Sequence, residues 1–180
     1  MEITPIYILS QIFIILNYVF LVITYQLKKK EKILLFNIAA QTSAGLSYIC
    51  LGAYTGLAMT VVSIIRNIVF IVNEKKNGVS EKTTPNEILM LLVIFALIAT
   101  LSVITFNGFL SLMSVFATML YTFSVWQKNT KIYKILGIPV SILWISYNIY
   151  IGSIFGIILE IILMISAIIG FIREVKKKWD

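Results

Sequence analysis

Long apolar stretches recur from one end of this chain to the other, and they restrict its fold more than any other feature. Seven can be separated, at residues 5–27, 33–51, 57–73, 88–106, 109–126, 135–151 and 157–172. A helix needs about 20 apolar residues to cross the hydrocarbon layer of a bilayer, and lipid offers no partner to an unpaired backbone amide. The stretches therefore predict seven transmembrane helices in an all-α polytopic membrane protein.

The breaks between the stretches are of two alternating kinds. Short uncharged turns occupy residues 52–56, 107–108 and 152–156, whereas Lys-rich segments occupy residues 28–32, 74–87, 128–134 and 173–180. Of the 15 Lys and Arg residues, 14 lie in the Lys-rich segments. By the positive-inside rule we expect the N-terminus outside and the C-terminus in the cytoplasm. The net charge of +7 is then explained by topology and contact with anionic lipid, and we expect no nucleic-acid partner.

Missing residue types exclude several kinds of chemistry. The chain has no His, one Cys, and a single Asp at its C-terminus. Catalysis by a Ser-His-Asp or Cys-His unit, a His or Cys metal site and a pair of membrane aspartates are therefore excluded. The sequence also contains no glycine-rich loop of the kind that binds ATP or dinucleotides. We expect neither an enzyme nor a bound metal or cofactor.

The chain resembles itself at a shift of about 100 residues. Gly52 and Gly56 fall on Gly152 and Gly156, each pair enclosing an uncharged turn. The repeat predicts a three-plus-one-plus-three plan. It consists of a first three-helix bundle at residues 1–76, a cytoplasmic loop and linker helix at 77–107, and a second bundle with a basic cytoplasmic tail at 108–180. Parallel repeats of this kind bind substrate at their interface, near the membrane midplane.

Glu160 is the one carboxylate inside the predicted spans. A charge at the centre of a bilayer costs about 2.5–3.5 kcal/mol on insertion scales, so this side chain needs a partner or a wet cavity. Glu160 could bind a polar or cationic solute or carry a proton. It could equally be a neutral carboxyl group that is hydrogen-bonded to a neighbouring helix.

Arg66 is the one cation inside a predicted span, and Asn67 follows it. It lies about 13 Å from the cytoplasmic end of its helix at 1.5 Å per residue. Snorkelling would cover only part of that distance. A structural role, clamping carbonyl groups or an inner gate, therefore competes with direct contact to a substrate.

Three further polar or aromatic residues, Asn17, Gln41 and Trp144, are close to the centres of their spans. Asn148 lies one turn above Trp144 on the same helix face. Trp normally prefers the head-group layer, so a central Trp144 with Asn148 could form a stacking wall and a hydrogen-bonding group for a ring-shaped solute. Membrane amides can also simply join helices, at about 0.6 kcal/mol on average. Pro139 offers a bending point in the same span.

The three-plus-one-plus-three plan resembles the PQ-loop superfamily of SWEET-type (MtN3) transporters. The likeness includes Gln26 and Gln127, which close the first span of each triple, and the Trp144-x-x-Tyr147 stretch before Gly152. Within that superfamily, residues 34–70 are similar to small bacterial inner-membrane proteins of the YgjV family.

The resemblance also implies roles for individual residues. It makes Trp144 the pocket Trp, and it puts Glu160 in the place of the pocket Asn, with Thr60 as its partner in the first triple. Arg66 and Asn67 match the Arg-Asn of the YgjV-like pattern.

These observations predict a transporter or facilitator in the bacterial inner (plasma) membrane. It would move a small polar solute, sugar-like or another metabolite, by alternating access between the two bundles. The expected substrate-binding residues are Trp144, Asn148, Glu160, Thr60, Asn17 and Gln41. The expected gating or structural residues are Arg66, Asn67, Gln26, Gln127 and Pro139.

Two alternatives stay open. One is a non-transporting membrane scaffold or sensor whose polar groups only hold helices together. The other is a vitamin-precursor transporter of the PnuC type. The expected partners are the lipid bilayer and the solute, and assembly into a homo-oligomer is undecided by the sequence.

Overall fold

Helices make up every regular element of the described chain. The computed structural model describes residues 4–26, 30–77, 84–126 and 130–176. Within these ranges there are seven α-helices and one short 3₁₀ helix: α1 (Pro5–Gln26), α2 (Lys30–Cys50), α3 (Tyr54–Asn77), α4 (Pro85–Ile104), η1 (Phe109–Ser111), α5 (Leu112–Trp126), α6 (Thr130–Ile151) and α7 (Ile154–Lys176). Each expected apolar stretch therefore overlaps a helix over most of its length, and the all-α prediction is confirmed for the described residues.

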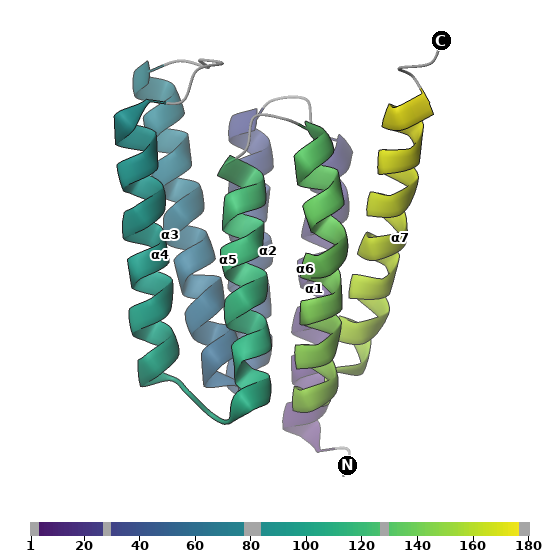
Figure 1. The fold of residues 1–180 in the computed structure, drawn as a ribbon. Helices are drawn as coiled ribbons and strands as arrows, with labels where there is room; N and C mark the ends of the chain where they lie inside the picture. The colour runs from purple at the N-terminus through teal and green to yellow at the C-terminus, as the bar shows by residue number, and fades with distance from the viewer. Residues whose placement is uncertain (1–3, 27–29, 78–83, 127–129, 177–180) are drawn as a thin grey trace. The chain divides into compact units, whose positions relative to one another are not determined.

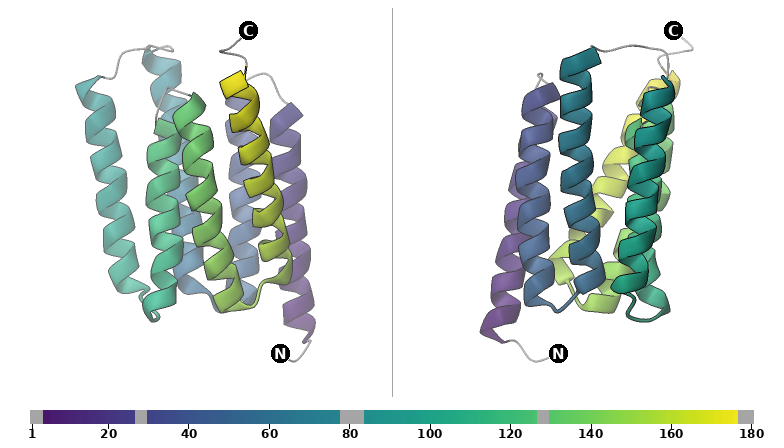
Figure 2. Two further views of the ribbon diagram at one scale, coloured as in Figure 1. Left: turned by 45° about the vertical axis from the view of Figure 1, so that its right-hand side comes forward. Right: turned by 90° about the vertical axis from the view of Figure 1, so that its left-hand side faces the viewer.

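The chain divides into two compact units, Met1–Phe106 (unit 1) and Asn107–Asp180 (unit 2). In unit 1, α2 packs against both α1 and α3, and α3 packs against α4. Figure 1 and the right-hand view of Figure 2 show these helices running alternately up and down. In unit 2, α6 packs against both α5 and α7. Each unit thus has a central helix, α2 or α6, that contacts its two sequence neighbours.

Four helices are long and apolar enough to cross a membrane, judged on the described residues alone: Pro5–Ile23, Tyr54–Asn73, Pro85–Ile104 and Phe109–Trp126. Two shorter apolar segments are Ile135–Ile151 and Ile154–Ile169. Within the described residues, four of the seven expected crossings therefore meet both the length and the hydropathy that a membrane span needs.

Large apolar side chains are exposed along many of these helices, which is what contact with lipid requires. On α4, Leu89, Leu92 and Val93 are 57–60% exposed. On α7, Ile158, Ile162 and Ile165 are 47–60% exposed. Outside a bilayer such surfaces would be very costly to hydrate.

The turns that join α2 to α3 and α6 to α7 have the same backbone geometry. Gly52 and Gly152 have φ angles of +67° and +70°, in the left-handed region that suits glycine. In the first turn, the amides of Gly52 and Ala53 donate to Ile49 O and Tyr48 O at 3.1 and 2.9 Å. The second turn repeats both bonds 100 residues later, at 3.2 and 2.9 Å. This paired pattern is the Schellman helix stop.

Both turns are shorter than the sequence suggested. Residues 52–56 and 152–156 were expected to be turns, but α3 begins at Tyr54 and α7 at Ile154. The reason is that the Schellman bonds end each helix within two residues. Ala53 O and Ser153 O then accept the first helical bonds of the next helix, from Leu57 and Ile157. Gly56 and Gly156 therefore lie inside helices.

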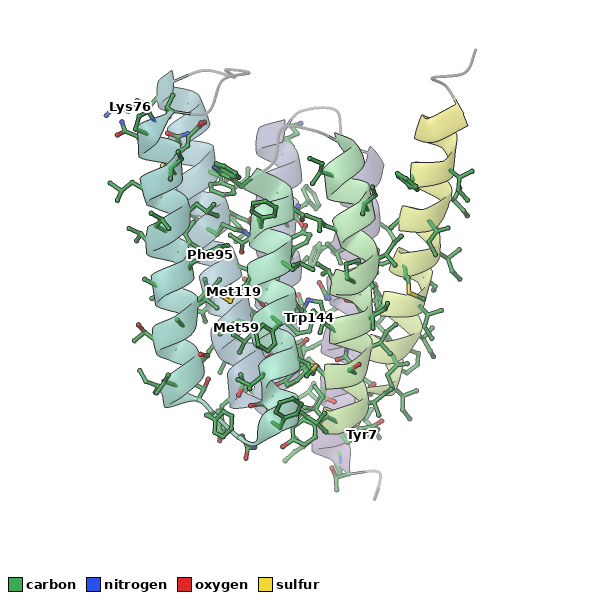
Figure 3. The ribbon with its side chains drawn as sticks, in the orientation of Figure 1. Tyr7, Met59, Lys76, Phe95, Met119 and Trp144 are labelled. Carbon is green, nitrogen blue, oxygen red and sulfur yellow. The ribbon has the colours of Figure 1, made fainter. Side chains whose placement is uncertain are left out.

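The two ends of unit 1 differ in chemistry. Lys75 and Lys76 occupy the last turn of α3, and Figure 3 shows Lys76 at the opposite end of unit 1 from Tyr7. Next along the chain, α4 begins with a capping box in which Thr84 and Glu87 exchange hydrogen bonds. At the other end, Thr55 Oγ1 donates to Thr105 O and ties the start of α3 to the end of α4.

Candidate functional site

Glu160 joins α7 to α6. Its carboxylate is hydrogen-bonded to the hydroxyl group of Ser141, which is buried on α6. Glu160 itself is half-buried. In the sequence it is the only charged residue from position 135 to position 172. A single carboxylate is thus placed on the contact between two apolar helices and is held there by a neutral donor.

The face of α6 that carries Ser141 also carries further polar and aromatic groups. Ser141, Trp144 and Asn148 are spaced i, i+3 and i+7, which puts them on one side of the helix. Trp144 is half-buried and lies about midway along α6 (Figure 3). Its ring meets that of Tyr147 edge to face, with centroids 5.8 Å apart and planes at 77°. Tyr147 is 1% exposed, so it fixes the orientation of Trp144 from the protein interior.

A second polar group lies at the turn between α6 and α7. Asn148 and Ser153 are 3% and 0% exposed, and neither Asn148 Oδ1 nor Ser153 Oγ has a hydrogen-bond partner among the described residues. Gly156 faces both of them: a methyl group on Gly156 would lie 2.7 Å from each oxygen. The glycine therefore lets the amide and the hydroxyl approach the backbone of α7. Buried unpaired acceptors are costly, and they point to a ligand or to solvent as the partner.

In unit 1, Thr60 occupies the corresponding level of α3. It is 3% exposed, and its hydroxyl donates to Leu57 O at 2.7 Å, within its own helix. A methyl group on Gly45 would lie 3.1 Å from Thr60 Oγ1, so α2 and α3 approach closely here. Nearby on α2, Ser47 is fully buried and its Oγ has no partner among the described residues. Thr60 thus serves close helix packing in unit 1.

Arg66 and Asn67 are neighbours in α3 and contact one another. Arg66 is 1% exposed and Asn67 4%. Arg66 Nε and Nη2 donate to Asn67 Oδ1 at 3.4 and 3.3 Å. The guanidinium group is thus enclosed in the protein instead of snorkelling to the surface, as the distance to the helix end suggested.

The remaining candidates are dispersed. Asn17 and Gln41 are half-buried on α1 and α2, and Asn17 Oδ1 has no partner among the described residues. Pro139 lies inside α6, as expected. Gln26 is the last residue of α1, but its side chain is outside the described set. Gln127 lies outside the described residues altogether.

Unit 2 thus brings together Trp144, Asn148 and Glu160, three of the six residues expected to bind substrate. Their roles there stay predictions. The structure adds Ser141 and Ser153, which the sequence analysis did not single out. Ser141 precedes Trp144 by three residues, so the helical spacing could have revealed it. Ser153 gave no such signal, because a Ser after a glycine turn is a common helix start.

Metal binding has no support in the described segments, where no three His, Cys, Asp or Glu side chains gather closely enough to hold an ion. The groups of unit 2 can instead donate and accept hydrogen bonds, and Glu160 adds one ionisable carboxyl group.

Comparison with known sequences adds one relationship. The family model Imp-YgjV, described as a bacterial inner membrane protein, matches residues 8–178. No curated protein and no solved structure matches the chain.

Proposed function

Because the chain belongs to the Imp-YgjV family of bacterial inner membrane proteins, we propose that it transports a small polar solute across that membrane. The family and the apolar helices make it an inner-membrane protein in contact with the lipid bilayer. The proposed mechanism is alternating access between two three-helix bundles. We propose that the solute is transported without chemical change.

The observation that carries this proposal is the line of polar groups between α6 and α7. The Ser141–Glu160 hydrogen bond joins α6 to α7, and Asn148 and Ser153 have unpartnered oxygens that face Gly156 of α7. Trp144 shares the face of α6 that carries Ser141 and Asn148. Polar groups at membrane depth are expensive and commonly mark a solute or ion pathway. Buried acceptors without protein partners are the feature that distinguishes such a pathway from helix packing alone.

The three-plus-one-plus-three plan is part of the proposal. Its support is the duplicated glycine turn, with matching φ angles and matching hydrogen bonds 100 residues apart. We propose seven crossings, with both glycine turns outside and the Lys-rich segments in the cytoplasm. In this arrangement α4 adds one crossing, so the second bundle has the same orientation in the membrane as the first.

Uptake into liposomes that contain the purified protein tests the function. A panel of sugars, amino acids, amines and nucleosides would be screened, and we expect at least one solute to enter faster than in empty liposomes. Glu160→Ala should then abolish most of that uptake. Ser146→Ala is the matched control, because the Ser146 hydroxyl only donates to Ile142 O of its own helix. Uptake that Glu160→Ala leaves unchanged in rate and affinity would refute the site.

A membrane scaffold or sensor is the second candidate, and the Ser141–Glu160 bond itself favours it, because it joins two helices. For a scaffold, Glu160→Ala would lower the free energy of unfolding while no solute is taken up. Measuring unfolding and uptake on the same variant separates the two candidates.

A further inference from the structure

Glu160 is far along its helix from the next basic residue of its unit, because Arg173 follows 13 residues later, a rise of about 20 Å. Its hydrogen-bond partner is the neutral Ser141 hydroxyl. The apolar sequence from position 135 to position 172 supplies no other charge. A carboxylate inside a bilayer is strongly favoured by an opposite charge. A positively charged ligand would provide it.

Trp144 is suitably placed to assist such a ligand. It is one helical turn from Ser141, which holds the Glu160 carboxylate. Tyr147 packs against the Trp144 ring edge to face, and half-burial leaves part of the indole accessible. An indole face attracts organic cations more strongly than any other side-chain ring. A carboxyl group bonded to Ser141 and an indole one turn along the same helix are therefore suited to bind an ammonium group together.

Asn148 and Ser153 specify a second feature of the ligand. Asn148 Oδ1 can only accept a hydrogen bond, and it is buried without a protein donor in the described chain. Ser153 Oγ is also buried without a partner among the described residues, and as a hydroxyl it can donate or accept. A ligand that reaches both groups must therefore donate to Asn148 Oδ1, and it can donate to Ser153 or accept from it. Asn148 and Ser153 face Gly156, which is four residues from Glu160 on α7, a rise of about 6 Å, so one small solute could reach both features.

We propose that unit 2 binds an organic cation with a second hydrogen-bond donor, such as an amino sugar. The ammonium group is held by Glu160 with help from Trp144, and a hydroxyl or amine elsewhere on the ligand donates to Asn148 and forms a hydrogen bond with Ser153. This inference rests on the proposed function for its transport step, because it names the class of solute that the site selects. Binding can be measured separately from transport.

Glucosamine, glucose and glucuronate form a matched set, since they share one ring and differ in charge. Each would be added to the purified full chain in detergent at a pH that keeps the amine protonated, and the shift in thermal unfolding would be measured. We expect glucosamine to stabilise the protein and the other two to have little effect. Glu160→Gln keeps the size of the side chain but removes its charge, and it should weaken glucosamine binding by at least about tenfold.

Two further variants complete the test. Ser153→Ala should weaken glucosamine binding by about fivefold, the value of one hydrogen bond. Glu87→Gln is the matched control: Glu87 lies in the capping box of α4, where Gln can also cap. It should bind glucosamine like the unaltered chain.

The outcomes separate the inference from the proposed function. Glucosamine binding without uptake into liposomes would overturn transport and leave the cation site standing. Uptake of glucose that is insensitive to Glu160→Gln would support transport and overturn the cation site. Equal binding of all three sugars, or of none, would also overturn it.

Discussion

Gly156 allows α7 to approach Asn148 and Ser153, and Gly156→Ala tests how tightly that approach is packed. The added methyl group would lie 2.7 Å from Asn148 Oδ1, 2.7 Å from Ser153 Oγ and 2.8 Å from Asn148 Cγ. Non-bonded atoms are most favourable at about 3.5–4.0 Å, so two side chains must move by most of an ångström. Overpacking of this kind costs about 1–3 kcal/mol.

The helix preference of Ala opposes that cost. Replacing Gly by Ala inside a helix gains up to about 1 kcal/mol. We therefore expect Gly156→Ala to lower the free energy of unfolding by about 1–2 kcal/mol. Gly137→Ala is the matched control in the same unit, because a methyl group there would meet only Ala167 Cβ, at 3.4 Å. That variant should be unchanged or stabilised by up to about 1 kcal/mol.

Unfolding by SDS from mild detergent micelles, followed by circular dichroism, measures both variants under the same conditions. The expected difference between them is about 2 kcal/mol, or roughly a thirtyfold change in the unfolding equilibrium. If Gly156→Ala were as stable as Gly137→Ala, the contact at Asn148 and Ser153 would not be tight and the reasoning would be wrong. As a second readout, Gly156→Ala should lower solute uptake, because it displaces Asn148.

Three further predictions concern helix ends. Gly52→Ala should lower the free energy of unfolding by about 1 kcal/mol in the same SDS titration, because Gly52 has a φ of +67° and no neighbour lies within 4 Å to add a clash. Gly52→Asn should lower it less, because Asn tolerates positive φ better than Ala. Equal losses for the two variants would contradict a purely conformational origin. Thr84→Ala should lower the free energy of unfolding by about 1 kcal/mol, because it removes the N-cap of α4. Thr84→Ser keeps the capping hydroxyl and should lose little stability. Thr55→Val should lower the free energy of unfolding by about 1 kcal/mol, because it deletes the hydrogen bond to Thr105 O. Hydrogen exchange at the end of α4 should become faster in this variant. Unchanged exchange there would contradict the role of the bond.

The helices could be predicted from the sequence because membrane helices follow from one local property, the length of an apolar run. The start of α4 also has a local signal, because Pro85 follows the N-cap Thr84 and Glu87 completes the capping box. The ends of the glycine turns were predicted less well. Gly56 and Gly156 look like turn residues in sequence, yet the Schellman bonds are already complete at residues 53 and 153.

The contacts between helices could not be predicted to the same degree. Sequence spacing shows which residues share a helix face, as Trp144 and Asn148 do. It does not show which face meets the next helix. The Ser141 partner of Glu160 and the approach of Gly156 to Asn148 depend on how α7 packs against α6, a property of the pair of helices and not of either sequence.

The duplicated glycine turn offers a comparison inside one molecule. Both copies close with the same backbone bonds, although Tyr48 and Ala53 stand in the first where Asn148 and Ser153 stand in the second. An amide and a hydroxyl side chain are therefore not needed to form the glycine turn. If the two halves descend from one ancestral segment, they diverged at this polar pair. Exchanging the residues of the two turns would test whether solute recognition is transferred with Asn148 and Ser153.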